Sequence, residues 1–177
     1  MLRSGPSHSW LAYDELLCLR LNRGARICWV RSLFRLVSRL GNGVFWYVLM
    51  LWLLLSRQDQ APLVVLHMAA TGLGCTALYK WLKTRTCRPR PYQVNRAISC
   101  DAVPLDHFSF PSGHTLHAVA FSTVLLAYDP GFAWLVLPFT LLVALSRMVL
   151  GLHYPSDVLA GGAIGVIVSG LSLAILP

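Results

Sequence analysis

The chain has 177 residues, of which 56% are hydrophobic and only 12% charged, and its mean hydropathy is +0.60. A soluble domain carries about 25% charged residues, so this composition excludes an ordinary soluble protein. Several uncharged stretches approach the ~20 residues that a helix needs to cross a bilayer, which indicates an integral membrane protein. No polar linker or internal repeat divides the chain, so we expect a continuous helical unit.

The net charge of +8 is carried mainly by two groups of basic residues. Seven arginines, from Arg3 to Arg39, precede the first long apolar run, and six lysines and arginines lie between Lys80 and Arg96. Neither group alternates with the aromatic residues of a nucleic-acid-binding surface, so no nucleic-acid partner is expected. The first group is typical of an anchor to anionic membrane lipids, and the second of an anion-binding site.

Residues 1–40 are predicted to form a basic, amphipathic N-terminal segment. Apolar and basic residues alternate at helical spacing in residues 10–21 and 27–40, and arginines recur every fourth residue from Arg31 to Arg39. The apolar residues are too scattered for a cleavable signal peptide. We therefore expect amphipathic helices that lie in the membrane interface.

Residues 41–177 are predicted to form the membrane-embedded domain. Its apolar runs are long enough to favour helices over strands. They comprise residues 43–56, 61–79, 114–128, 131–150 and 158–176. The first run is short for a span and is expected to recruit residues before Gly41. The predicted fold is all-α, a bundle of five transmembrane helices, or of six if part of residues 9–40 also crosses.

The long polar segment at residues 80–113 is the expected place for chemistry. It follows the second apolar run, and two further crossings return the chain to the same face of the membrane at residues 146–157. Two polar segments that are far apart in the sequence are therefore expected to meet on one side of the membrane.

The first polar cluster runs from Lys83 to Arg90 and Pro91. Clustered cations at a membrane are costly to bury, so they usually have an anionic partner, and one interpretation is an anion-binding site. Taken alone, however, the cluster favours the other interpretation, a basic flank that anchors the end of the preceding helix.

The second cluster is Pro111-Ser112-Gly113-His114, directly before an apolar run. Pro and Ser suit a helix start, and Gly lets the backbone approach a ligand closely. The free N–H groups of a helix N-terminus bind phosphate, and His114 would stand at the membrane surface as a proton donor. The alternative is a capping turn with an incidental histidine.

The third cluster contains Ser146, Arg147, His153 and Asp157. A carboxylate four residues after a histidine can hold one ring nitrogen and leave the other free for nucleophilic attack. Pro155 predicts a helix that starts nearby, with the carboxylate in its first turn. The alternative, a polar break between two membrane helices, does not explain three such residues in an apolar stretch.

Together the three clusters resemble the three-part signature of the type 2 phosphatidic acid phosphatase superfamily. That signature is Lys83, six residues and Arg90-Pro91, then Pro111-Ser112-Gly113-His114, then Ser146-Arg147, five residues, His153, three residues and Asp157. All three parts are present in order and without a substitution, and the apolar layout extends the resemblance over about residues 43–177.

The resemblance implies a metal-independent lipid phosphatase that needs no cofactor. It implies that His153 is the nucleophile that forms a phosphohistidine, that Asp157 orients it, and that His114 is the general acid and later the base that activates water. The implied phosphate-binding residues are Lys83, Arg90, Ser112, Gly113 and Arg147. The expected substrate is a lipid phosphate monoester or a polyprenyl diphosphate, drawn from the surrounding membrane lipids.

Two other functions stay open. One is a lipid phosphotransferase, in which an alcohol or a second lipid replaces water. The other is a catalytically silent membrane protein that binds phospholipid. Vanadium-dependent haloperoxidases share the anion-binding signature but are soluble, so the apolar runs argue against them. The residues predict neither the particular lipid nor the oligomeric state.

The expected location is the cell membrane, such as a bacterial inner membrane. Five crossings place the N-terminal region on the face of the site, and its seven arginines against Asp14 and Glu15 give a net charge of +5. The opposite turns carry a net charge of −1, from Arg57, Asp59 and Asp129. The positive-inside rule would then put the site in the cytoplasm. The resemblance implies an extracytoplasmic site, which we expect, either through a sixth crossing or because the interfacial arginines do not set the topology.

Several neighbouring residues receive structural interpretations. His117 is expected to pack or hydrogen-bond rather than bind a metal, and Trp46 to belong to an interfacial aromatic belt. Asp106 could touch substrate or water, but a place in a solvated loop is the preferred interpretation. Cys87 and Cys100 flank one polar loop and are expected to be free thiols, or to pair if that loop faces an oxidising compartment.

Overall fold

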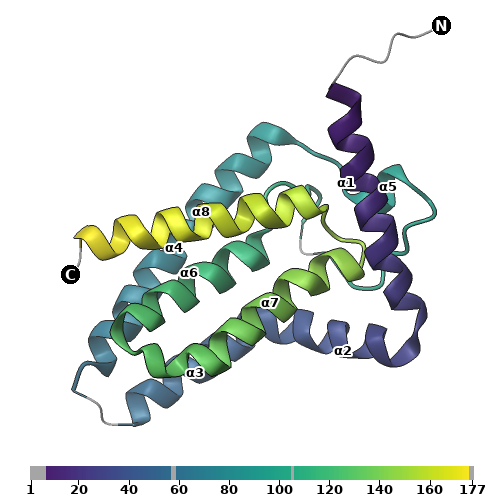
Figure 1. The fold of residues 1–177 in the computed structure, drawn as a ribbon. Coiled ribbons are helices and arrows are strands. Elements are labelled where there is room, and N and C mark those ends of the chain that lie inside the picture. The colour runs from purple at the N-terminus through teal and green to yellow at the C-terminus, as the bar shows by residue number, and fades with distance from the viewer. Residues whose placement is uncertain (1–6, 57–58, 105, 176–177) are drawn as a thin grey trace, which may run out of the picture.

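The computed structural model describes residues 7–56, 59–104 and 106–175. In these ranges the secondary structure is helical and without a strand, which confirms the all-α prediction (Figure 1). The helices are α1 (Ser7–Asn22), α2 (Cys28–Arg39), α3 (Phe45–Leu55), α4 (Ala61–Thr86), α5 (Pro91–Val94), α6 (Gly113–Tyr128), α7 (Ala133–Val149) and α8 (Pro155–Ile175), with short turns η1 (Arg23–Arg26), η2 (Leu40–Val44) and η3 (Pro130–Phe132). The turn predicted at residues 57–60 lies partly outside the described residues.

Within the described residues, four helical segments are long and apolar enough to cross a membrane. They are Cys28–Leu55, Ala61–Val94, Pro130–Val149 and Pro155–Ile175. Helix α6 has 16 residues, which at 1.5 Å per residue is about 24 Å and short of the ~30 Å hydrocarbon core. It contacts α4, α7 and α8, so its neighbours rather than lipid surround much of it. Whether the molecule has the predicted five or six crossings therefore depends on whether α6 and the N-terminal helices cross the membrane.

Helices α6 and α8 pack closely because small residues of α8 face α6. A Cβ atom on Gly161 would lie 2.6 Å from the carbonyl oxygen of Ser112, and one on Gly165 would lie 2.7 Å from that of Leu116. Regularly spaced small residues let membrane helices approach in this way. The first turns of both helices are also joined, since the Ser112 amide donates to the Asp157 carbonyl oxygen at 3.0 Å.

Helices α2 and α3 form one bent segment that the π-helical turn η2 joins. The bend lies at Gly43, whose φ of 119° favours glycine. The candidate span begins at Cys28, so the helical segment that contains the first apolar run also includes residues before Gly41, as expected. Helix α8 begins at Pro155 with Asp157 in its first turn, also as predicted.

The apolar core lies between α3, α4, α6 and α7, and Trp46 is one of its largest members. Trp46 is 1% exposed, and its ring centroid lies 5.3 Å from that of Phe121 and 5.8 Å from that of Phe139. The prediction that Trp46 belongs to an interfacial belt is therefore wrong. It lies on the inner face of α3, whereas Trp52 of the same helix is half-exposed.

Helix α1 lies across one end of the bundle, beside α5 and the ends of α7 and α8 (Figure 1). The side-chain amide of Asn22 donates to the carbonyl oxygens of Ser99, at 3.0 Å, and Val149, at 2.9 Å. Arg35 of α2 lies 3.5 Å from the carboxylate of Asp101. The N-terminal helices are thus bound to the polar loop and to the end of α7.

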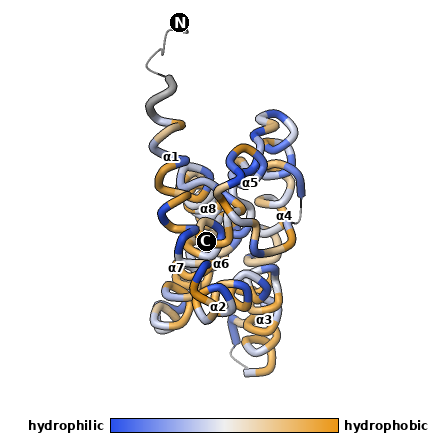
Figure 2. The backbone as a smooth tube through the Cα atoms, turned by 90° about the vertical axis from the view of Figure 1, so that its right-hand side faces the viewer, coloured by the Kyte–Doolittle hydropathy of each residue, from blue (hydrophilic) through white to orange (hydrophobic). Residues whose placement is uncertain are grey.

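The polar loop between α5 and α6 lies at this same end of the bundle. Figure 2 views the molecule from this end and shows hydrophilic residues around α5. Cys87 and Cys100, which flank part of the segment, are exposed free thiols, in agreement with the first of the two expectations for them.

Candidate active site

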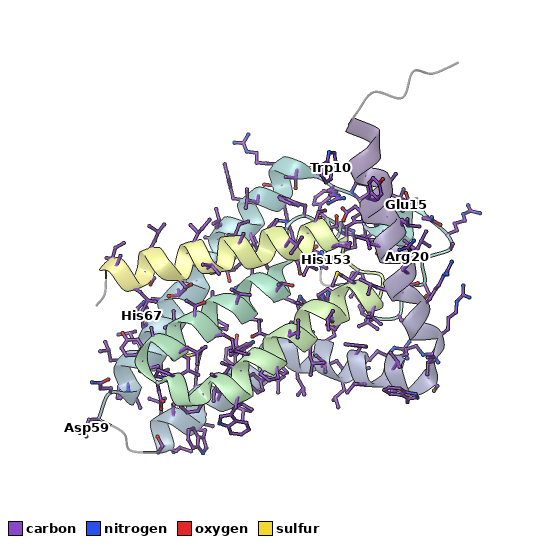
Figure 3. All side chains as sticks on the ribbon, viewed as in Figure 1. Trp10, Glu15, Arg20, Asp59, His67 and His153 are labelled. Atoms are coloured by element: carbon purple, nitrogen blue, oxygen red, sulfur yellow. The ribbon has the colours of Figure 1, made fainter. Side chains whose placement is uncertain are left out.

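The predicted clusters lie together at the end of the bundle that α1 covers, around a cavity of about 500 Å³. Figure 3 shows His153 at this end and His67 toward the other end. The polar wall of the cavity comprises Asn42, Thr76, Tyr79, Lys83, Arg90, Asp106, Gly113, His114, His117, Arg147 and His153. The apolar wall comprises Trp46, Met50, Ala69, Leu73 and Phe121. The meeting of residues 80–113 and 146–157 is the arrangement expected from the crossings.

Three cations from two separate segments border the polar end of the cavity. Lys83, Arg90 and Arg147 are each at most 5% exposed. The Arg147 guanidinium donates to the hydroxyl of Ser38 on α2, and its Nε has no hydrogen-bond partner among the described residues. Buried cations with a free donor atom are suited to binding an anion.

Asp106 of the polar loop contacts two of these cations. Both of its carboxylate oxygens lie 2.7 Å from Lys83 Nζ, and the guanidinium of Arg90 donates to its Oδ1 at 2.9 Å. The side chain is 34% exposed and borders the cavity. The two cations hold the carboxylate against the site, so of the two interpretations the solvated loop residue is the less suitable one.

His153 lies between the cations and Asp157. Its Nε2 faces Arg90, 3.4 Å from a guanidinium nitrogen, and its Nδ1 faces Asp157 Oδ2 at 3.7 Å. That second distance is too long for a hydrogen bond, and Nδ1 has no other partner among the described residues. The orientation is the predicted one, with one ring nitrogen toward the carboxylate, but the expected hydrogen bond is not formed.

Asp157 is fully buried, and other groups occupy its oxygens. Arg88 donates to Oδ1 at 2.7 Å, and the Tyr154 amide donates to Oδ2 at 2.8 Å. Each carboxylate oxygen can accept a second hydrogen bond, so these contacts fix the position of the carboxylate without excluding a bond from His153.

Arg88 is in turn held by Asp14 of α1, a contact that sequence reasoning missed. The second guanidinium nitrogen of Arg88 lies 2.7 Å from the Asp14 carboxylate. Asp14 also accepts a hydrogen bond from the Ser156 amide at 2.9 Å and another from the Ser156 hydroxyl. The N-terminal helix therefore reaches the first turn of α8 beside Asp157.

His114 stands in the first turn of α6 and borders the cavity. Its Nε2 contacts the side-chain oxygen of Asn42, which sequence reasoning also missed. His117, one turn further, contacts the Gly113 carbonyl oxygen at 2.8 Å and the Thr76 hydroxyl at 3.0 Å. The hydrogen-bonding role expected for His117 is confirmed.

Ser112 and Gly113 differ in their position relative to the cavity. Ser112 is fully buried and occupies the N-cap position of α6, but its hydroxyl bonds to the Thr115 hydroxyl at 3.0 Å instead of capping the backbone. Gly113 borders the cavity, and a Cβ atom placed on it would meet only the Tyr79 ring, 3.5 Å away. Packing within the protein therefore does not require glycine at this position.

The electrostatic surroundings set the protonation states of His153 and Asp106, two site residues that lie outside the helical spans. Burial, reinforced by the charges of Arg147, Arg90 and Lys83, holds the pKa of His153 well below its ordinary value of 6.5. Burial acts to raise the pKa of Asp106, but the hydrogen bond and charge of Lys83 and the charge of Arg90 outweigh it, and the pKa is lowered. The histidine is therefore neutral and the aspartate ionised at neutral pH.

This fold and site define a class of protein: a helical membrane bundle with a cationic, histidine-containing cavity that continues between its helices. More specifically, the chain belongs to the PAP2 superfamily, which its residues 61–177 match. Its relatives include the undecaprenyl-diphosphatase of Sulfolobus acidocaldarius, which is 30% identical in an alignment of 155 residues that covers 85% of this chain and 72% of that protein.

Other relatives cover less of the chain. The undecaprenyl-diphosphatase BcrC of Bacillus subtilis is 30% identical over 70% of this chain and 63% of its own length. The decaprenylphosphoryl-5-phosphoribose phosphatase of Mycobacterium tuberculosis is 37% identical over 51% of this chain and 49% of its own length.

Solved structures with the same fold support the assignment. LpxE of Aquifex aeolicus superposes with a TM-score of 0.70 at 26% identity, over 88% of this chain and 92% of that one. The PAP2-type phosphatidylglycerolphosphate phosphatase of Bacillus subtilis superposes with a TM-score of 0.68 at 22% identity, over 94% and 86% of the two chains. The second likeness concerns the fold alone.

Proposed function

We propose that this protein is a membrane lipid phosphatase that hydrolyses a lipid phosphate monoester or a polyprenyl diphosphate through a phosphohistidine. The observation that carries the proposal is a cavity bordered by three buried cations, three histidines and an apolar wall. Phosphatase relatives of the same superfamily, several of which are named for polyprenyl substrates, support it.

In this mechanism Lys83, Arg90 and Arg147 bind the phosphoryl oxygens, together with the backbone amides at the start of α6. The neutral ring of His153 attacks phosphorus through Nε2, the nitrogen that faces Arg90. The phosphorus–oxygen bond to the leaving group breaks as the phosphorus–nitrogen bond forms. Cations already in place stabilise the charge of this transition state without reorganisation.

The proton transfers are assigned to His114. It protonates the leaving oxygen in the first step and then, as a neutral base, removes a proton from the water that cleaves the phosphohistidine. Asp157 orients His153 and balances the positive charge on the ring. The three fixed cations supply the charge that metal ions provide in other phosphatases, so the reaction is expected to be metal-independent.

The apolar part of the cavity is assigned to the lipid tail. It lies between α3 and α4 and reaches from Lys83 to Ala69, which on one helix is about 21 Å. The bordering residue Leu73 is 73% exposed, on a surface that lipid would cover. A lipid could thus enter laterally and keep its chain in the membrane.

For the topology, we infer five crossings, in which α2 with α3, α4, α6, α7 and α8 span the membrane. The position of α1 across the end of the bundle favours a helix in the interface and not a sixth crossing (Figure 1). We further infer a cell-membrane protein, of the bacterial inner-membrane kind, whose site faces away from the cytoplasm.

The testing experiment is a phosphate-release panel with purified protein in detergent. The lipids are phosphatidate, phosphatidylglycerol phosphate, undecaprenyl diphosphate and a lipid A phosphate, each with and without EDTA. At least one should release phosphate, and the His153→Ala and His114→Ala variants should abolish release. His107→Ala is the matched control, because this exposed histidine does not border the cavity.

Three outcomes would overturn parts of the proposal. Near-wild-type release from the His153→Ala variant would exclude the nucleophile, and loss of activity in EDTA would exclude the metal-free mechanism. A phosphorylated acceptor in place of free phosphate would identify a phosphotransferase. Absence of turnover with every lipid would leave a phospholipid-binding protein.

A further inference from the structure

Two of the three proposed phosphate-binding cations already hold an anion from the protein itself. The Asp106 carboxylate lies 2.7 Å from Lys83 Nζ through both oxygens and 2.9 Å from a guanidinium nitrogen of Arg90. The Asp106 backbone carbonyl oxygen also accepts from Arg90 Nε at 3.1 Å. A carboxylate in this position makes the contacts that two phosphoryl oxygens would make.

Arg147 differs from Lys83 and Arg90 in its side-chain contacts. It makes one side-chain contact, to Ser38, and its Nε is buried without a partner among the described residues. A phosphate that reaches the cavity therefore finds Arg147 available, but meets a like charge at Lys83 and Arg90. Like charges a few ångströms apart at a partly buried site oppose binding strongly.

We propose that Asp106 is an internal competitor that weakens the binding of phosphate groups at this site. The inference rests on the proposed function, because it assigns Lys83, Arg90 and Arg147 to the substrate phosphate. A lipid phosphate gains additional binding free energy from its chain between α3 and α4, which offsets the displacement of Asp106. Inorganic phosphate has no such chain, so the product dissociates.

The alternative role for Asp106 is to hold Lys83 and Arg90 in place. The two roles predict opposite results. If Asp106 competes, removing its charge strengthens phosphate binding. If Asp106 only positions the cations, removing its charge leaves them to repel one another and move apart, and phosphate binding weakens.

The test uses Asp106→Asn, which keeps the shape of the side chain and removes its charge. The inhibition constant of inorganic phosphate, measured against lipid hydrolysis, should fall by at least about tenfold, and the KM for the lipid should fall in parallel. Asp101→Asn is the matched control, since Asp101 pairs with Arg31 and Arg35 and does not border the cavity. That control should leave both constants within about twofold, as expected for a charge screened from the site.

A direct binding measurement keeps the test independent of turnover. Calorimetric titration of inorganic phosphate into detergent-purified wild type and Asp106→Asn should show the same gain in affinity, even if none of the lipids is hydrolysed. An unchanged or weaker affinity in the folded variant would overturn the inference, whereas failure of the lipid panel alone would overturn only the proposed function. Asp106→Ser provides a second uncharged side chain if the Asn variant does not fold.

Discussion

At the scale of single residues, the arrangement around His153 separates the tasks of its two ring nitrogens. Nε2 faces the cations of the cavity and Nδ1 faces Asp157. Burial, together with the surrounding positive charge, keeps the ring neutral, and a neutral imidazole has the lone pair that nucleophilic attack requires. In the proposed mechanism the same charges bind the phosphate, so one set of residues would prepare both reaction partners.

This arrangement predicts a particular pH dependence. Protonation of His153 removes the nucleophile, and its pKa in the free protein lies well below 6.5. The acid limb of kcat/KM assigned to this residue should therefore lie at lower pH than an unperturbed histidine would give. A pH series with two lipids whose phosphates ionise differently separates substrate titration from that of the enzyme. An acid midpoint near 6.5 with both lipids would contradict the prediction.

Gly113 offers a test of the space reserved for phosphate. A Cβ atom there meets only the Tyr79 ring at an ordinary contact distance, so Gly113→Ala should unfold at the same temperature or slightly higher. The same methyl group projects at the cavity wall, and kcat/KM should fall by about a hundredfold, as for a misplaced reacting group. Gly161→Ala is the contrasting control, because its Cβ would clash with the Ser112 backbone and lower stability as well.

Much of this site could be predicted from the sequence, and the remainder could not for a physical reason. Lys83, Arg90, Arg147 and His153 have fixed spacings within helices and their ends, and the crossings bring those ends together. Asn42 and Asp14 have no such relation to the clusters. Asn42 depends on a π-helical turn, and Asp14 on how an N-terminal helix docks, and both are settled by tertiary packing.

At the scale of elements, helix α1 is more than a surface anchor. Through Asp14 it contacts Arg88 and Ser156, and Arg88 contacts the buried Asp157. Carboxylate and guanidinium groups alternate along this chain, so each buried charge has a partner of opposite sign. The docking of α1 therefore helps to fix the carboxylate that faces His153.

Asp14→Asn should consequently lower kcat by about tenfold, in the range that loss of a buried charged hydrogen bond gives, and leave the lipid KM nearly unchanged. Asp14 does not border the cavity, so lipid binding has no direct reason to change. Glu15→Gln is the matched control, because the adjacent Glu15 contacts only Asn95 of the polar loop among the described contacts. Equal losses in the two variants would point to a general effect of helix docking.

At the scale of the whole molecule, the groups assigned to the reaction lie at one end of the bundle. The cations and histidines of the cavity, the polar loop and α1 all lie there, and α3 and α6 end at the opposite end of the bundle (Figures 1 and 3). The fold class followed from the length of the apolar runs. The membrane orientation did not, because the basic N-terminal helices belong to the same end as the site and compete with the family expectation.

Labelling of a single introduced cysteine decides the orientation. Asn95→Cys, in a background with Cys28, Cys87 and Cys100 changed to Ser, should react with a membrane-impermeant maleimide in intact cells. A cysteine introduced at Asp129, on the opposite turn, should react only after permeabilisation. The reverse pattern would place the site in the cytoplasm and make the arginines of α2 true topological signals.

The close packing of α6 and α8 contrasts with the bend that precedes α3. At Gly161 and Gly165 the backbone of α6 lies too close to α8 for a side chain larger than that of glycine. The part of the cavity wall that α3 forms begins instead at the bend, where the φ of Gly43 favours glycine. Asn42 lies beside this bend and contacts His114. A substitution that alters the bend should therefore also displace a hydrogen-bond partner of the proposed proton donor.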